Sequence, residues 1–275
     1  MKLKDVSAIM RVLDPRYPTN LAIIVLSVVV GAAALLYRLL VVGAGLWDSL
    51  LWSLAAGLTV GLTWALSREL DPDHDLSAFV AAVLAIAGLI IFGLPGIVIH
   101  FWLLVLARIV IRPVGFTARL LDSLALLILG GWLAWGSNWI VGLMTAVAFL
   151  LDARLSNPLR RQLYFAGAAL LITIVFVAIN GGSRPADNTS FLIVVLLISL
   201  LFVWVIVRSG KVEQRTDATR QPMDARRVRA AQLVSLLTAL LMAWWYGNAG
   251  VVQLIPLWAS FLGIALFRIG VRVWR

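Results

Sequence analysis

Ten long apolar stretches follow one another along the 275 residues of this chain, separated by short polar or glycine-containing breaks. A helix satisfies its own backbone hydrogen bonds in lipid, so a chain with this pattern folds as a bundle of membrane-spanning helices. Hydrophobic residues make up 62% of the chain and charged residues 13%, which is far from the composition of a soluble domain. We therefore predict an all-α, polytopic integral membrane bundle in which residues 1–275 form a single membrane domain.

Glycine and proline mark the ends of the predicted spans, because both residues interrupt helices. Two breaks matter most, at residues 93–96 and 136–138, where one long kinked or re-entrant helix is the alternative to two separate helices. The predicted spans cover residues 20–42, 47–67, 77–93, 96–112, 118–135, 138–152, 162–180, 190–208, 229–246 and 250–268.

The distribution of positive charge favours ten spans. With ten spans and a cytoplasmic N-terminus, all 23 Lys and Arg residues except Arg38 and Arg184 fall on the cytoplasmic side. Merging either doubtful pair of helices would carry a block of arginines across the membrane, against the positive-inside rule. We therefore predict that both termini are cytoplasmic and that the protein is a multi-pass protein of the cell (inner) membrane.

Charge and cysteine content exclude several classes of function. The chain has no cysteine, which excludes disulfides, thiolate catalysis and cysteine-ligated metal sites. The net charge of +10 in so apolar a chain indicates contact with anionic lipid headgroups. We expect membrane lipids as partners and no nucleic acid, and the sequence leaves open a homo-oligomer or a partner within a membrane complex.

The chain is expected to contain several structural parts. Residues 1–14 place apolar side chains at helical spacing between basic ones, which indicates an amphipathic helix at the membrane interface. Shifting the chain by 86 residues aligns Arg68 with Arg154, and Pro72 aligns with Pro158. This match suggests a tandem repeat of four helices. The remaining predicted parts are residues 20–112 and 118–208 for the two copies, 209–228 for a basic cytoplasmic linker, and 229–268 for a final helical hairpin.

The densest polar segment is residues 68–75, in the predicted cytoplasmic connection after the second span. Asp71, Asp73 and Asp75 alternate along it, and carboxylate oxygens are the ligands that Mg²⁺ prefers. Helix capping is the alternative, with Asp71 as the N-cap and Pro72 as the first helical residue. The sequence leaves both explanations open, and Mg²⁺ is the one cofactor it suggests.

The corresponding loop after the sixth span carries Arg154, Arg160 and Arg161. Guanidinium groups pair readily with phosphate, so these arginines are predicted to bind phosphate opposite the acidic motif. The predicted spans contain few ionisable residues, which disfavours a proton pump that works through buried carboxylates. The other polar candidates are Arg68, Glu69, His74, His100, Asp122 and Asp152.

An acidic motif after span two with a related loop after span six resembles the intramembrane prenyltransferases of the UbiA type, which bind polyprenyl diphosphate through magnesium. Their Asn-Asp-x-x-Asp pattern is absent here, and the second loop keeps only Asp152. In size and number of spans the chain is also similar to the drug/metabolite transporters.

Three functional hypotheses follow from these patterns. The narrowly preferred one is a cytoplasmic-face enzyme that acts on a lipid or polyprenyl phosphate with a divalent metal. The alternatives are a transporter of small solutes or lipids, and a membrane scaffold or accessory subunit of a complex. The sequence alone does not decide whether the protein is an enzyme.

Overall fold

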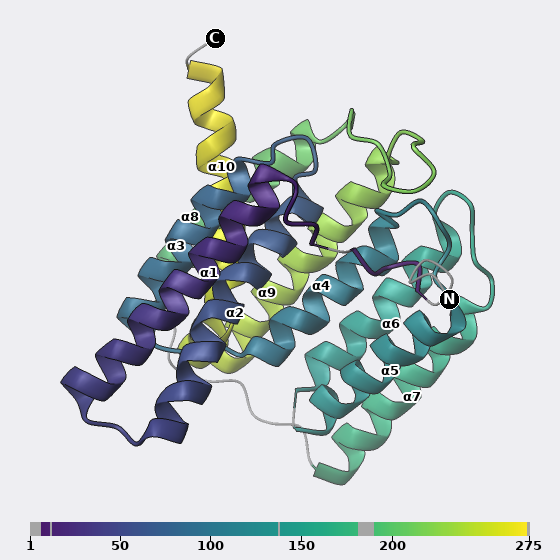
Figure 1. Cartoon of the computed structure of the whole chain (residues 1–275). Helices are drawn as coiled ribbons and strands as arrows, with labels where there is room; N and C mark the ends of the chain where they lie inside the picture. The colour runs from purple at the N-terminus through teal and green to yellow at the C-terminus, as the bar shows by residue number, and fades with distance from the viewer. Residues whose placement is uncertain (1–6, 12, 137, 181–189, 274–275) are drawn as a thin grey trace. The chain divides into compact units, whose positions relative to one another are not determined.

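A computed structural model describes residues 7–11, 13–136, 138–180 and 190–273. These residues form ten α-helices and one short π-helix, with no strand among them (Figure 1). The prediction of an all-α fold is therefore confirmed. In chain order the elements are α1 (Pro18–Tyr37), η2 (Arg38–Val42), α2 (Leu46–Leu70), α3 (Ser77–Phe92), α4 (Ile97–Ile111), α5 (Leu120–Trp135), α6 (Trp139–Arg154), α7 (Gln162–Asn180), α8 (Leu192–Arg208), α9 (Ala225–Gln253) and α10 (Ile255–Val273).

Each predicted apolar span coincides with one of these helices. The two doubtful breaks both separate helices, since α3 ends at Phe92 before α4, and α5 ends at Trp135 before α6. The last predicted break, between residues 246 and 250, contains a kink within α9 at Gly247, whose non-helical φ of 56° is one that glycine adopts readily.

Five helical segments of the described chain are long and apolar enough to cross a membrane: Pro18–Val42, α2, residues Gln162–Ile179 of α7, α9 and α10. The helices α3, α4, α5 and α8 are apolar but shorter. A helix of 16 residues, such as α3, is about 24 Å long, less than the roughly 30 Å hydrocarbon core of a bilayer. This pattern of apolar helices is that of a membrane protein.

The chain divides into two compact units. We call Val12–Phe101 together with Val252–Arg275 the terminal unit, and Met1–Arg11 together with Trp102–Val251 the central unit. These bounds differ from the suggested repeat copies at 20–112 and 118–208, and the repeat stays a prediction.

The terminal unit is built from α1, α2, α3 and α10. Helix α2 packs against α1 and α3, and α10 packs against α3 and α2. The helices approach closely where glycine faces a neighbouring backbone. A Cβ atom on Gly57 of α2 would lie 2.7 Å from the carbonyl oxygen of Ser27, and one on Gly263 of α10 would lie 2.6 Å from the amide nitrogen of Ala81. Packing of small residues of this kind is typical of helices in membranes.

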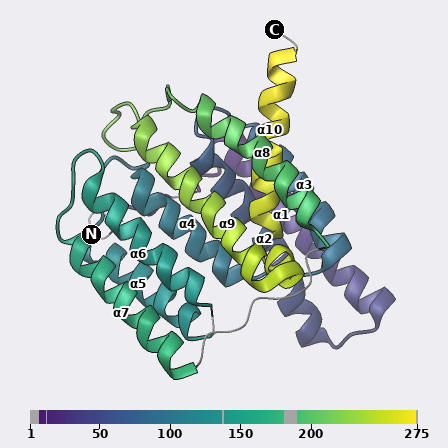
Figure 2. The same ribbon diagram turned by 180° about the vertical axis from the view of Figure 1, so that it is seen from behind.

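The central unit contains the helices α5, α6 and α7, which lie side by side in both views (Figures 1 and 2). Trp102 donates a hydrogen bond from Nε1 to Oγ1 of Thr145 on α6, at 2.9 Å. Thr145 in turn donates to the carbonyl oxygen of Val141 one turn earlier, so its hydroxyl is satisfied within the bundle.

Two segments expected at the membrane surface are ordered against the central unit. Residues 7–11 form bends and irregular backbone, not the helix expected over 1–14. The Ser7 hydroxyl and the Ala8 amide both donate to the carboxylate of Asp122, which holds the backbone in a non-helical path. In the basic segment 209–228, the amides of Asp217 and Ala218 donate to the carbonyls of Pro113 and Val114.

Candidate functional site

The acidic motif at residues 68–75 lies in the terminal unit, at the end of α2 and in the turn before α3. Helix α2 ends at Leu70 and α3 begins only at Ser77, with Leu76 as its N-cap. Asp71 is therefore the C-cap residue of α2, and Pro72 lies in a turn. The capping explanation, with Asp71 as N-cap and Pro72 as first helical residue, is wrong because this turn delays the start of α3.

Asp71 is fully buried and shares one oxygen with two donors. Its Oδ1 accepts a hydrogen bond of 2.6 Å from Nη2 of Arg268 on α10 and lies 3.0 Å from Nδ1 of His74. Burial alone would raise the pKa of the Asp71 carboxyl, but the hydrogen bonds with His74 and Arg268 outweigh it and lower that pKa below its ordinary value. Asp71 is therefore held as an anion.

This anion fixes the orientation of His74. An ionised carboxylate only accepts hydrogen bonds, so Nδ1 of His74 carries the proton of this contact and Nε2 is the ring nitrogen left outside it. The side chain of His74 is 34% exposed, in contrast to Asp71 beneath it. The ring of Phe267 packs edge-on against the imidazole, with the two ring centres 5.9 Å apart. The result is an aspartate–histidine dyad with a partly exposed base.

A second ion pair lies beside the dyad. Nε of Arg68 donates to Oδ1 of Asp75 at 3.0 Å, and its Nη1 donates to Oδ1 of Asn20 at 3.3 Å. The guanidinium also lies 4.8 Å from the ring centre of Trp64, within cation–π range. Asp75 thus faces an arginine in the same motif.

The three aspartates predicted to hold Mg²⁺ have different surroundings. Asp71 is buried against Arg268, Asp75 pairs with Arg68, and Asp73 is exposed. Glu69 is buried within α2. Within the described part of the chain, no group of three or more acidic or histidine side chains lies close enough together to hold a metal ion. The magnesium site stays a prediction that this geometry does not strengthen.

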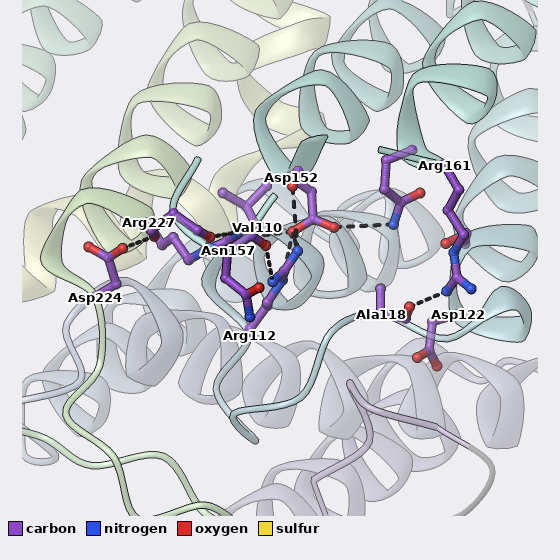
Figure 3. Close-up of polar contacts among 12 residues, drawn as sticks. Val110, Arg112, Ala118, Asp122, Asp152, Asn157, Arg161, Asp224 and Arg227 are labelled. Atoms are coloured by element: carbon purple, nitrogen blue, oxygen red, sulfur yellow. Dashed lines mark hydrogen bonds and ion pairs between the residues drawn. The ribbon is translucent and has the colours of Figure 1, made fainter. Parts of the chain in front are cut away.

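The central unit contains a second buried aspartate, Asp152 in the last turn of α6 (Figure 3). Its Oδ1 accepts hydrogen bonds of 2.8 Å from Nε of Arg112 and from Nη1 of Arg227. Nε2 of Gln162 donates to the other oxygen at 3.2 Å. The pKa of the Arg112 guanidinium is lowered overall, because burial and the nearby Arg227 lower it more than Asp152 raises it. The guanidinium nevertheless remains charged, since arginine keeps its proton in proteins.

The two buried arginines also bind backbone carbonyls where α4 and α6 end. Arg227 donates to the carbonyl oxygens of Val110 and Ser156, and Arg112 donates to that of Asn157 at 2.9 Å (Figure 3). Carbonyls at helix C-termini lack intrahelical partners, so arginines are well suited to satisfy them. The Asp152 cluster therefore ties the ends of α4 and α6 to the start of α9.

Two of its members have unusual backbone geometry. Arg112 and Asn157 have φ angles of 58° and 54°, and each precedes a proline. A residue before proline avoids the right-handed helical conformation, and the left-handed one costs free energy in residues other than glycine. The hydrogen bonds of the Asp152 cluster offset this cost.

The predicted phosphate-binding arginines follow Asp152 in the chain. Arg154 and Arg160 are exposed, and Arg161 donates from Nη2 to the carbonyl oxygen of Ala118 (Figure 3). Asp122 has a structural role. Its carboxylate accepts hydrogen bonds from the hydroxyl of Ser7, from the amide of Ala8 and from the amide of Arg119 at the start of α5. These residues belong to the central unit, whereas the acidic motif belongs to the terminal unit.

His100 lies buried in α4, with Nδ1 2.7 Å from the carbonyl oxygen of Gly96 one turn earlier. This contact joins the imidazole to the backbone just before α4. Sequence reasoning missed Arg112, Arg227 and Arg268, which were assigned only to lipid-facing charge. Their signal was the presence of buried aspartates in an apolar chain, since buried charges require partners.

No protein-family model, curated protein or solved structure matches this chain.

Proposed function

We propose that the protein is a multi-pass protein of the cell (inner) membrane in which all ten helices cross or enter the bilayer and both termini are cytoplasmic. The coincidence of helices with the ten apolar segments supports this topology. The bias of Lys and Arg toward alternate connections supports the orientation, because basic loops stay in the cytoplasm.

Within this topology, the protein is an enzyme that acts on a phosphate-bearing lipid at its cytoplasmic face, with His74 as the general base. The observation that carries this proposal is the hydrogen bond between buried Asp71 and Nδ1 of partly exposed His74. A histidine oriented in this way takes a proton through Nε2 from an attacking water or hydroxyl group. The oxygen of that nucleophile then bonds to phosphorus as the bond from phosphorus to the lipid oxygen breaks, and His74 returns the proton to that oxygen, so that the lipid leaves as an alcohol.

The remaining residues have supporting roles. Asp71 is a positioning residue, since it fixes the ring and stabilises the imidazolium that forms. Arg268 keeps Asp71 ionised, and Arg68 adds positive charge to the same end of the terminal unit. An anionic substrate is favoured by these arginines.

The test uses the purified full-length chain in mixed micelles with phosphatidic acid, phosphatidylglycerol or a polyprenyl phosphate. Products are identified by mass spectrometry and phosphate release is measured. We expect His74→Gln to lower the rate by on the order of 10²-fold or more, as for loss of a general base. Far-ultraviolet circular dichroism checks that the variant keeps its helices.

Asp73→Asn separates this mechanism from the magnesium prediction. Asp73 is exposed and next to His74 in sequence, but it lies outside the dyad. If His74 is a general base without a metal, Asp73→Asn keeps the wild-type rate and a chelator does not change that rate. If the motif holds magnesium, both the substitution and the chelator lower the rate. A wild-type rate in His74→Gln would contradict the proposal and leave transport or an accessory role, as predicted from the sequence.

A further inference from the structure

The loop of residues 154–161 has its backbone fixed from the inside. The carbonyl oxygen of Ser156 accepts from Nη2 of Arg227 at 2.6 Å, and that of Asn157 accepts from Nη1 of Arg112 at 2.9 Å. The Ser156 hydroxyl donates to Asp224. The central unit itself satisfies these carbonyl oxygens and holds the backbone of the loop in place. Only the side chains of the loop are then available to bind a ligand.

That outer surface is positively charged. Arg154 and Arg160 are exposed, and no acidic side chain among the described residues pairs with either guanidinium. The nearby acids are already engaged. Asp152 is shared by Arg112 and Arg227, and Asp224 accepts from Ser156 and from the backbone at the start of α9.

Arg161 adds a partly fixed donor to the same loop. Its Nη2 donates to the carbonyl oxygen of Ala118, which anchors the guanidinium at one end (Figure 3). Its Nε is buried and has no hydrogen-bond partner within the described residues. A buried donor without an acceptor costs free energy, and an oxygen of an anionic ligand would satisfy it.

Exposed apolar side chains flank the charged loop on both sides. Leu150 of α6 is 42% exposed, and Leu163 and Tyr164 of α7 are 41% and 83% exposed. Apolar faces next to basic residues, with a tyrosine between them, are typical of the interface between lipid tails and headgroups. A free anion in solution would need no such apolar surroundings.

From this arrangement we propose that the 154–161 loop binds the phosphate headgroup of an anionic membrane lipid through Arg154, Arg160 and Arg161. The site belongs to the central unit and is independent of the proposed reaction at His74. Guanidinium groups bind phosphate by paired hydrogen bonds, while the lipid tails lie against the exposed apolar faces of α6 and α7.

The test measures binding of short-chain phosphatidic acid to the purified full-length protein by isothermal titration calorimetry in a neutral detergent. The site variant is Arg154→Gln with Arg160→Gln. Its matched control is Lys211→Gln with Arg220→Gln, which removes the same charge from exposed positions of the neighbouring basic segment. We expect the site variant to bind on the order of tenfold more weakly and the control to bind as the wild type does.

Two further titrations separate the sources of phosphate. Phosphatidylcholine should bind weakly to all three proteins, and inorganic phosphate should bind the wild type more weakly than phosphatidic acid does. Equal weakening by site and control variants would overturn the proposal, since it would indicate general attraction to a basic surface. Inorganic phosphate binding as tightly as phosphatidic acid would also overturn it, because a lipid would then not be required. Since this assay measures no turnover, it stands whether or not His74 is a general base.

Discussion

At the scale of single residues, buried charge is the feature that organises this apolar chain. Asp71 and Asp152 are both fully buried at the ends of helices, and each is met by arginine. A buried carboxylate is costly unless it is paired and hydrogen-bonded, so each aspartate requires its partners. The two sites differ in one respect that bears on function. Asp71 also binds a partly exposed histidine, whereas Asp152 binds a buried glutamine.

Asp71→Asn should destabilise the protein in a pH-dependent way. The pKa of Asp71 in the fold is lower than in an unfolded chain, so its stabilisation is fully present above the unfolded value of about 3.9 and is lost as pH falls through the folded value. We expect a loss of about 3 kcal/mol near neutral pH, and convergence with the wild type only as pH falls below the lowered pKa of Asp71 in the fold.

The measurement is thermal unfolding in detergent between neutral and acidic pH, with exposed Asp73→Asn as control. A deficit of Asp71→Asn that stays constant down to the lowest pH would contradict the role given to its ionised carboxylate.

At the scale of the helices, the sequence predicted positions well and the contacts of their ends poorly. The apolar spans correspond to observed helices, and the breaks at 93–96 and 136–138 correspond to separations between helices. Both are local signals, since each span is a run of apolar residues bounded by glycine. The span predicted at 77–93 begins where α3 does, at Ser77, whereas the alternative with Asp71 as the N-cap of this helix is wrong. The turn between them depends on Arg268, a residue 197 positions away in the chain, and no local pattern contains that information.

Helix contacts in the terminal unit yield a prediction about α10. Gly263 faces the backbone of Ala81 on α3, where an added methyl group has no room, whereas no atom lies within 4 Å of a methyl group on Gly270 in the same helix. Gly263→Ala should therefore destabilise the protein by about 1–3 kcal/mol, the usual cost of overpacking. Gly270→Ala should change stability by no more than about 1 kcal/mol. Thermal unfolding in detergent compares the two, and equal stability would contradict the close packing of α3 and α10.

At the scale of the whole molecule, charge predicts an orientation that helix positions alone do not supply. Arginines lie in the connections after α4, α6 and α8 and, as Arg68, in the last turn of α2, while Arg38 is the single arginine at the glycine-containing connection after α1. Both candidate sites lie in arginine-bearing connections, so the enzyme and lipid-binding proposals require the same face of the membrane. The chemistry was harder to predict than the orientation, since it depends on which arginine meets which aspartate.

The topology is tested most directly by cysteine accessibility, because the natural chain has no cysteine to interfere. Single variants Gly45→Cys, Asn138→Cys and Lys211→Cys are treated in intact cells, and then in broken cells, with a membrane-impermeant maleimide. Ten spans with cytoplasmic termini predict labelling of Gly45→Cys and Asn138→Cys in intact cells and of Lys211→Cys only after the membrane is broken. Labelling of Lys211→Cys in intact cells, or protection of Asn138→Cys until the cells are broken, would contradict this topology and the cytoplasmic face assigned to both sites.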